Sequence, residues 1–200
     1  MAETIRDRCF FIRLTPADKN SPVSFSKTCY NTCGKFVKKA GSIVDKLDIK
    51  LWTLASKGQI VPDRSLLITP EQIEMIKKSA ALNTAVLDHV AAHIHAGMST
   101  AEIDKLVYDF TTEHGGIPAP LNYEGFPKSV CTSINNVICH GIPSEHEILI
   151  DGDIINVDVS TILNGYFSDA SRMFTIGEVS PEAERIVRVT KECVELGLKA

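Results

Sequence analysis

The sequence predicts an α+β fold in which a mostly antiparallel sheet is backed by helices. Three segments carry helix-start signals, and the chain between the second and third changes to the Val-, Ile- and Thr-rich alternation of strands. The dipeptide Asn164-Gly165 lies between two such strand-like runs within residues 153–176. It predicts a tight hairpin, because both turn residues need positive φ. The order helix, helix, strands, helix is typical of the α+β class.

The three expected helices begin at similar signals. Thr69 and Ser99 are each followed three residues later by Gln or Glu, and Ser180 is followed by proline at the first helical position. Apolar residues then recur at helical spacing. The first helix is expected to end at Gly97 and the second at Gly115-Gly116.

A domain boundary is expected near residues 65–68, between an N-terminal extension, residues 1–68, and a folded domain, residues 69–200. The extension has poor periodicity, with room for one short helix within residues 34–57. It holds twelve basic and six acidic residues, whereas the remainder holds nine and nineteen. A basic arm on an acidic body indicates contact with the ribosome, nucleic acid or another anionic surface; the alternative is a solvated extension.

Composition favours a cytoplasmic protein that does not contact a membrane. The apolar content of 44% is ordinary for a globular protein. No apolar run approaches the ~20 residues that cross a bilayer. The apolar patch Cys9–Ile12 is too short for a signal peptide. The six cysteines are scattered, which favours reduced thiols, and Cys29 and Cys33 lack the second pair that a structural zinc site needs.

The expected hairpin brings two aspartates together. With its turn at residues 164–165, Ser160 faces Asp169 and Asp158 faces Ser171. Asp158 and Asp169 then lie on one face as diagonal neighbours, with backbones ~7–8 Å apart. Such carboxylates can bind one divalent ion or bridge two ions ~3.5–4 Å apart.

The surroundings of this pair indicate a buried face. Val157 and Val159 flank Asp158. A buried, unpaired carboxylate is costly, and two on one face raise a pKa, so a bound cation would relieve both penalties. The alternative is that one aspartate is an exposed strand residue or a turn acid, as we expect for Asp151 and Asp153.

A histidine follows the loop of residues 122–128 and the strand-like run of residues 129–140. His140 is expected to end that strand and to point into a cleft, where it could donate a hydrogen bond or transfer a proton. A purely structural histidine is the alternative. His89, His93 and His95 are interpreted as polar residues at a helix end, because His95 lies off the face that the other two share.

Residues 122–143 and 152–174 closely resemble the paired signatures of type I methionine aminopeptidases, which are metallopeptidases of the pita-bread fold. Four motifs occur in the family's order and spacing, and the resemblance runs from about Thr69 to Ala200. They are Tyr-x-Gly-Phe-Pro-Lys-Ser-Val-Cys, Asn-x-Val-x-Cys-His-Gly-Ile-Pro, Gly-Asp-Ile-x-Asn-x-Asp-Val and Gly-Tyr-x-x-Asp-x-Ser-x-Met-Phe. Aminopeptidase P and prolidase share the fold but not the cysteine–histidine segment.

The resemblance implies removal of the initiator methionine from nascent polypeptides, with two divalent metal ions as cofactors. The sequence leaves Co, Mn, Fe and Zn open as their identity. By resemblance, Asp158 is the bidentate ligand of one ion and Asp169 bridges both. His140 is the catalytic hydrogen-bond donor, which also contacts the substrate. The walls of the methionine pocket, where an unbranched thioether fits aromatic and sulfur groups, are Tyr123, Phe126 and Cys131.

The sequence also departs from the family pattern. The family has five metal ligands, two Asp followed by one His and two Glu, and no residue here matches the last three. We therefore expect the first half of a pita-bread fold, incomplete at the C-terminus, that is poorly stable and nearly inactive alone. Two alternatives remain: a catalytically incomplete fragment, and a pita-bread binding protein that contacts the ribosome or nucleic acid through its basic arm.

Overall fold

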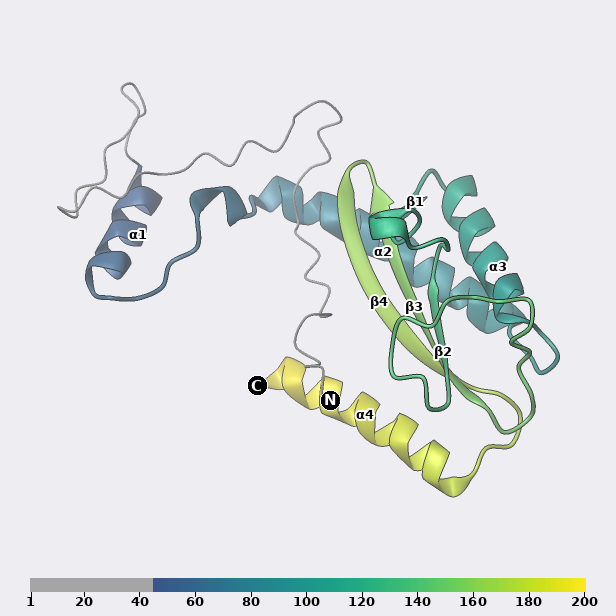
Figure 1. Ribbon diagram of the computed structural model, residues 1–200. Coiled ribbons are helices and arrows are strands. Elements are labelled where there is room, and N and C mark those ends of the chain that lie inside the picture. Colours follow the sequence, from purple (N-terminus) through teal and green to yellow (C-terminus); the bar gives the residue numbers. More distant parts are fainter. Residues whose placement is uncertain (1–44) are drawn as a thin grey trace, which may run out of the picture. The chain divides into compact units, whose positions relative to one another are not determined.

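The structure, a computed structural model, describes residues 45–200 (Figure 1). The chain divides into two compact units, residues 1–68 and 69–200. In the described part of the first unit, the short helix α1 (Lys46–Ser56) is followed by the 3-10 turn η2 (Arg64–Leu66). Most of the basic arm, together with Cys9, Cys29 and Cys33, lies outside the described residues.

An ion-pair cluster ties α1 to the segment that follows it. The side chain of Asp45 caps the helix by accepting a hydrogen bond from the amide of Asp48. The guanidinium of Arg64 forms ion pairs with the carboxylates of Asp45 and Asp48. The hydrogen bonds from Arg64 and from the helix amides hold the pKa of Asp45 well below its usual range.

The second unit has the predicted α+β architecture. It contains α2 (Pro70–His93), α3 (Thr100–Glu113), β1 (Ile117–Pro118), the 3-10 turn η3 (Tyr123–Gly125), β2 (Cys131–Ile134), β3 (Ile154–Leu163), β4 (Tyr166–Thr175) and α4 (Pro181–Lys199). Both expected capping boxes are present, at Thr69 and Ser99. Helix α2 ends at His93 rather than at Gly97 as expected, because Ile94 adopts an extended conformation.

The antiparallel sheet is built around β3. Strand β4 pairs with one edge of β3, and β1 and β2 pair with the other. The hairpin register is confirmed, since Ser160 faces Asp169 and Asp158 faces Ser171. The turn at Asn164-Gly165 has the positive φ values, 52° and 82°, that the dipeptide predicts.

The predicted strand over residues 129–140 is much shorter than expected. Strand β2 ends at Ile134, because Asn135 adopts φ 49° and the chain turns back on itself. The amide of Val137 closes this turn by donating to the carbonyl of Ile134. His140 consequently lies in the returning loop and does not end a strand.

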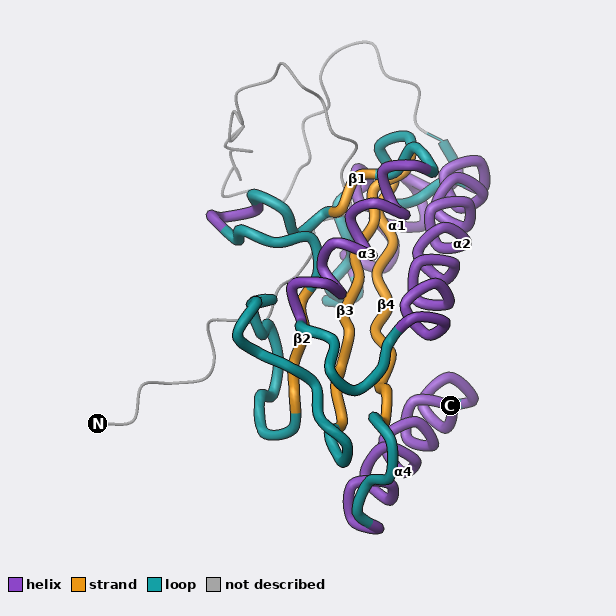
Figure 2. Tube along the Cα trace, turned by 90° about the vertical axis from the view of Figure 1, so that its right-hand side faces the viewer, coloured by secondary structure: helices purple, strands orange, loops and turns teal. Residues whose placement is uncertain are grey.

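The two faces of the sheet differ in what covers them. Helix α2 packs against β3 and β4, and α3 packs against α2 and β1 (Figure 2). We call this side the helix face. Side chains of Ile155, Val157 and Val159 point to it, are at most 1% exposed, and form the core with apolar residues of both helices. The opposite side, which we call the open face, carries Asp158 and Ser160.

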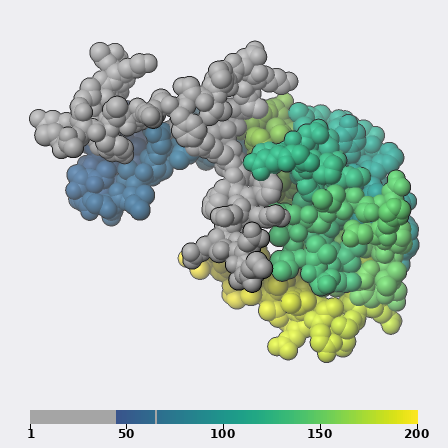
Figure 3. Space-filling model, viewed as in Figure 1, coloured from purple at the N-terminus to yellow at the C-terminus, as the bar shows by residue number. Residues whose placement is uncertain are grey.

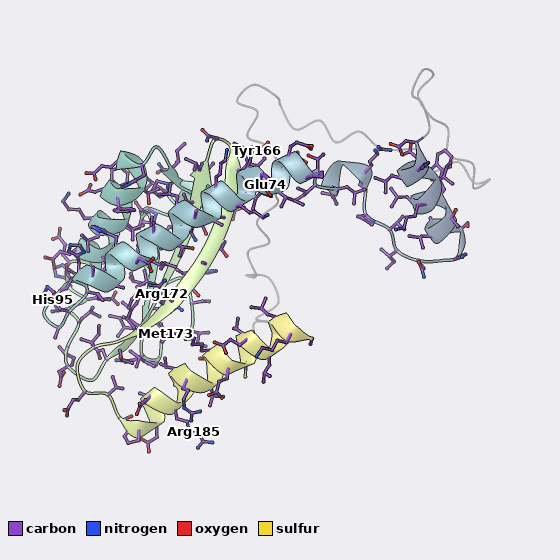
Figure 4. The ribbon with its side chains drawn as sticks, turned by 180° about the vertical axis from the view of Figure 1, so that it is seen from behind. Glu74, His95, Tyr166, Arg172, Met173 and Arg185 are labelled. Carbon is purple, nitrogen blue, oxygen red and sulfur yellow. The ribbon has the colours of Figure 1, made fainter. Side chains whose placement is uncertain are left out.

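Polar contacts fix α2 on the helix face. The hydroxyl of Thr161 donates to Oδ1 of Asn83 at 2.7 Å, and both side chains are buried. Nearer the strand's other end, Arg172 of β4 lies beside α2, where it pairs with Asp88 at 2.9 Å (Figure 4).

Helix α4 differs from α2 and α3 in its burial. Ser180 caps its start as predicted, but none of its residues is buried. Three of its apolar side chains, Ile186, Val194 and Leu198, are more than half exposed. The helix lies along one border of the 69–200 unit, in yellow in Figure 3. Within residues 45–200, no helix is both long enough and apolar enough to cross a membrane.

Candidate metal centre

The two predicted metal ligands lie on the same side of the hairpin. Ser160 faces Asp169 across the strands, so the open face holds both Asp158 and Asp169. The hydroxyl of Ser160 donates to Oδ1 of Asp169 at 2.5 Å, which leaves the second carboxylate oxygen available to another partner. The geometry therefore allows the two carboxylates to share a cation.

Electrostatics show that the two carboxylates interact. Burial, and after it the charge of Asp169, raise the pKa of Asp158 to about 6, while His140 opposes the shift. The main cause is the removal of a carboxylate from water, and the second is its repulsion by the neighbouring carboxylate. A divalent cation is the kind of group that removes both the burial penalty and the repulsion.

Cys131 lies directly beside this pair. It is the β2 partner of Asp158 and occupies the same face. Burial, followed by the charges of Asp158, Cys139 and Asp169, raises the pKa of the Cys131 thiol to about 12. The thiol is therefore neutral near pH 7, which suits a pocket wall better than an anionic ligand.

A tight backbone contact holds His140 near the aspartates. The amide of Thr132 donates to the carbonyl of Gly141 at 2.9 Å, and the amide of Gly141 donates to the hydroxyl of Ser133 at 3.3 Å. A Cβ at position 141 would lie 1.9 Å from the carbonyl oxygen of Thr132, so only glycine allows this approach. His140 itself has φ 56°. Sequence reasoning missed Ser133 and Gly141, although the glycine next to His140 was a visible signal.

Tyr123 and Phe126 lie in the loop that leads into β2. The amide of Asn122 donates to the carbonyl of Phe126 at 2.8 Å, which closes the loop at its base. Farther along, Asp104 of α3 accepts a hydrogen bond from the amide of Ser129 at 2.7 Å. The loop is thus tied to α3, and Tyr123 is 48% exposed at its tip.

One acidic residue of the predicted turn is more buried than expected. Asp153 closes the turn as predicted, since its amide donates to the carbonyl of Ile150 at 3.2 Å, but it is only 7% exposed. Its carboxylate accepts hydrogen bonds from the side chain of Asn135 at 2.7 Å and from the amide of Ile150 at 2.9 Å. The role is structural, because these bonds join the turn after β2 to the start of β3. Asp151 is exposed as expected and accepts from the amide of Glu178.

The described residues supply only part of a metal site. Across residues 45–200, no group of three or more His, Cys, Asp or Glu side chains is placed to hold one metal ion. Two carboxylates on one face fit divalent cations that prefer oxygen ligands, and further ligands would be needed for tight binding.

Comparison with known proteins identifies the family of this arrangement. The model of metallopeptidase family M24 matches residues 74–200, which include both aspartates and His140. The chain belongs to this family. The resemblance to methionine aminopeptidases that the sequence motifs predict is confirmed by the relatives described next.

Several curated relatives in the family are named methionine aminopeptidase. The chain is 49% identical over 138 residues to methionine aminopeptidase A of Synechocystis, with 69% of this chain and 54% of that protein covered. It is 44% identical over 128 residues to the Rickettsia prowazekii methionine aminopeptidase, with 63% and 49% covered. The chain thus spans about half the length of these relatives.

Solved structures of other proteins share the fold. Methionine aminopeptidase from Rickettsia prowazekii superposes with a TM-score of 0.62 at 41% identity, covering 63% of this chain and 50% of that one. An X-Pro aminopeptidase from Thermotoga maritima, 22% identical with a TM-score of 0.55, covers 64% of this chain and 35% of that one and shows likeness of fold alone. The predicted pita-bread fold is confirmed.

Proposed function

We propose that the protein to which this chain belongs removes the initiator methionine from nascent polypeptides by metal-dependent hydrolysis of the first peptide bond. The observation that carries the proposal is the coupled pair Asp158 and Asp169 on the open face. The names of the relatives support methionine as the residue removed. A binding-only role is less well supported, because such a protein would not need this costly pair of charges.

The proposal assigns metal binding to the two aspartates. Asp158 and Asp169 would together hold the divalent cations, because their carboxylates share the open face. Ser160 orients Asp169 through its hydrogen bond, so the carboxylate meets the cations in a fixed direction. Bound divalent cations supply Lewis acidity, which activates water and polarises a peptide carbonyl. Two ions drawn from Co, Mn, Fe and Zn are part of the proposal.

The proposal assigns substrate binding to the groups around the pair. His140 donates a hydrogen bond to the scissile amide, from a position fixed by the contact between Gly141 and β2. The neutral thiol of Cys131 forms one wall of the methionine pocket, where an uncharged, polarisable group suits a thioether. Tyr123 and Phe126 form the aromatic walls.

Other parts of the proposal concern the whole protein. Residues 69–200 act as part of the catalytic domain, and the remaining metal ligands come from outside the described residues. The basic residues of the segment 1–68 contact the ribosome, and the protein acts in the cytoplasm. Because two carboxylates bind metal weakly, residues 1–200 alone should be nearly inactive.

The test is a peptidase assay on a form of the protein that continues past Ala200, supplemented with Mn²⁺ or Co²⁺. We expect release of methionine from a Met-Ala-type peptide, and loss of that release in Asp169→Asn. The matched control is Asp88→Asn, which changes the same side chain on the helix face. Comparable activity in Asp169→Asn and the parent protein would remove Asp169 from the mechanism.

A further inference from the structure

Three histidines and a phenylalanine form a row of rings on α2 and α3, on the side of the sheet away from the two aspartates. We call this row the histidine row. Ring centroids of His89 and His93 are 4.3 Å apart. His89 stacks on Phe110 at 4.6 Å, and Phe110 stacks on His114 at 4.1 Å. Aromatic packing therefore fixes the positions of these imidazoles.

His89 and His93 are one helical turn apart, at positions i and i+4 of α2. Side chains with this spacing lie on the same face of a helix, and two histidines so placed can bind one cation. Each imidazole nitrogen would lie ~2.0–2.1 Å from the metal. The ring centroids of the pair, 4.3 Å apart, are near enough for one cation to contact both rings.

The hydrogen bonding of His93 prepares it to be a ligand. Its Nδ1 lies 2.8 Å from the carbonyl oxygen of His89, and a carbonyl can only accept, so Nδ1 carries the proton. Nε2 then keeps a lone pair and is free of the helix backbone. Metal-binding histidines commonly donate their other ring N–H to a carbonyl in this way, which fixes the ring and its tautomer.

The local charges also favour a cation. The pair lies in the last turns of α2, where the helix macrodipole places partial negative charge. Burial and the neighbouring His93 lower the pKa of His89, which keeps its ring neutral, while the carboxylate of Glu113 is close enough to act in the opposite direction. Imidazole nitrogens next to a negative helix end are suited to hold a positive ion.

We propose that His89 and His93 form a second metal site, which chelates a borderline divalent transition cation such as Ni²⁺ or Zn²⁺. Imidazole favours these ions, whereas a carboxylate pair favours harder ions such as Mn²⁺. No third His, Cys, Asp or Glu completes the site in the described part of the chain, so water fills the other positions. The chelate links two successive turns of α2 and stabilises its C-terminal end.

The sequence pattern indicates that His89, His93 and His95 are polar residues at a helix end, with His95 off the face that the other two share. The structure separates them, because His95 follows the end of α2 and its Nδ1 lies 2.8 Å from the carbonyl of Ala96 (Figure 4). His95 is therefore a matched control for the pair: it is nearby, exposed and outside the proposed chelate.

The experiment is a Ni²⁺ titration of the 200-residue chain, followed residue by residue through the imidazole NMR signals. Paramagnetic Ni²⁺ should broaden the signals of His89 and His93 before those of His95 and His140. In His93→Gln, broadening of the His89 signal should need at least ~tenfold more Ni²⁺, as expected when a ligand is lost. His95→Gln should behave like the parent chain.

Two results would overturn the proposal. One is an unchanged Ni²⁺ requirement for the His89 signal in His93→Gln. The other is earlier broadening at His95 or His140 than at the pair in the parent chain. Helix content measured by circular dichroism checks that His93→Gln is folded, and His89→Asn, read at the His93 signal, repeats the test from the other side of the chelate.

Discussion

The two faces of one strand contribute to stability with opposite signs. On the helix face of β3, Ile155, Val157 and Val159 are fully buried against apolar side chains, which stabilises the fold. On the open face, Asp158 is half-buried beside Asp169, and the cost appears as its raised pKa. Neighbouring residues of β3 thus have opposite effects on the stability of the fold. The face that costs stability is the one on which we place the chemistry.

The largest expected effect is on the helix face. Replacing Ile155 with alanine removes a fully buried side chain, and the free energy of unfolding should fall by ~2–5 kcal/mol. Ile154 is the matched control, because it is the next residue of β3, points to the open face and is only partly buried. Urea unfolding should show a clearly smaller loss for Ile154→Ala, and equal losses would contradict the distinction between the faces.

The next effect concerns the backbone contact that holds His140. In Gly141→Ala the new Cβ would collide with the carbonyl oxygen of Thr132, so the loop must move away from β2. We expect a loss of ~1–3 kcal/mol in the free energy of unfolding. Gly197→Ala is the control: its Cβ would meet open space within α4, and alanine favours a helix. If both variants unfold at the same urea concentration as the parent chain, the contact does not constrain the loop.

A smaller effect, of opposite sign, is expected on the open face. In metal-free protein near pH 7, Asp158→Asn should raise the free energy of unfolding. The pKa shift from 3.8 to about 6 corresponds to at most ~3 kcal/mol, and partial exposure reduces the gain to ~1–2 kcal/mol. In the parent chain, the folded state binds the proton of the Asp158 carboxyl more tightly than the unfolded state does. The stability that this bound proton contributes is therefore complete below about pH 4 and is lost as the pH rises through about 6.

This pH dependence gives the measurement. The measurement is urea unfolding with a metal chelator present, at several pH values between 4 and 8. As the pH rises, the free energy of unfolding of Asp158→Asn should increase relative to that of the parent chain. Asp88→Asn on the helix face should lose a little stability, since it breaks an exposed ion pair with Arg172. A loss of stability in Asp158→Asn at pH 7 would show that the charge is compensated by other groups.

Sequence reasoning succeeded where the signals are local. The hairpin register follows from the two residues Asn164 and Gly165, and that register alone places Asp158 and Asp169 on one face. The starts of three helices could be predicted, because the capping residues Thr69, Ser99 and Ser180 and their partners lie within three residues of one another. These features need no knowledge of distant contacts.

Sequence reasoning failed where distant contacts decide. Asp153 closes the turn that its neighbours predict, but they do not predict its burial or the hydrogen bond that it accepts from Asn135, eighteen positions earlier. His140 follows a run with strand-like alternation, but the turn at Asn135 redirects the chain, and Gly141 then packs against Thr132. The hydrophobic periodicity of the segment does not predict that the chain turns back toward β2.

The central claim is that Asp158 and Asp169 hold a divalent cation together. The most direct measurement is Mn²⁺ binding by the 200-residue chain, followed through the electron paramagnetic resonance signal of free Mn²⁺. We expect the parent chain and Asp151→Asn, an exposed turn acid, to bind Mn²⁺ equally, and both Asp158→Asn and Asp169→Asn to lose most of that binding. Undiminished Mn²⁺ binding in either of the last two variants would contradict the claim.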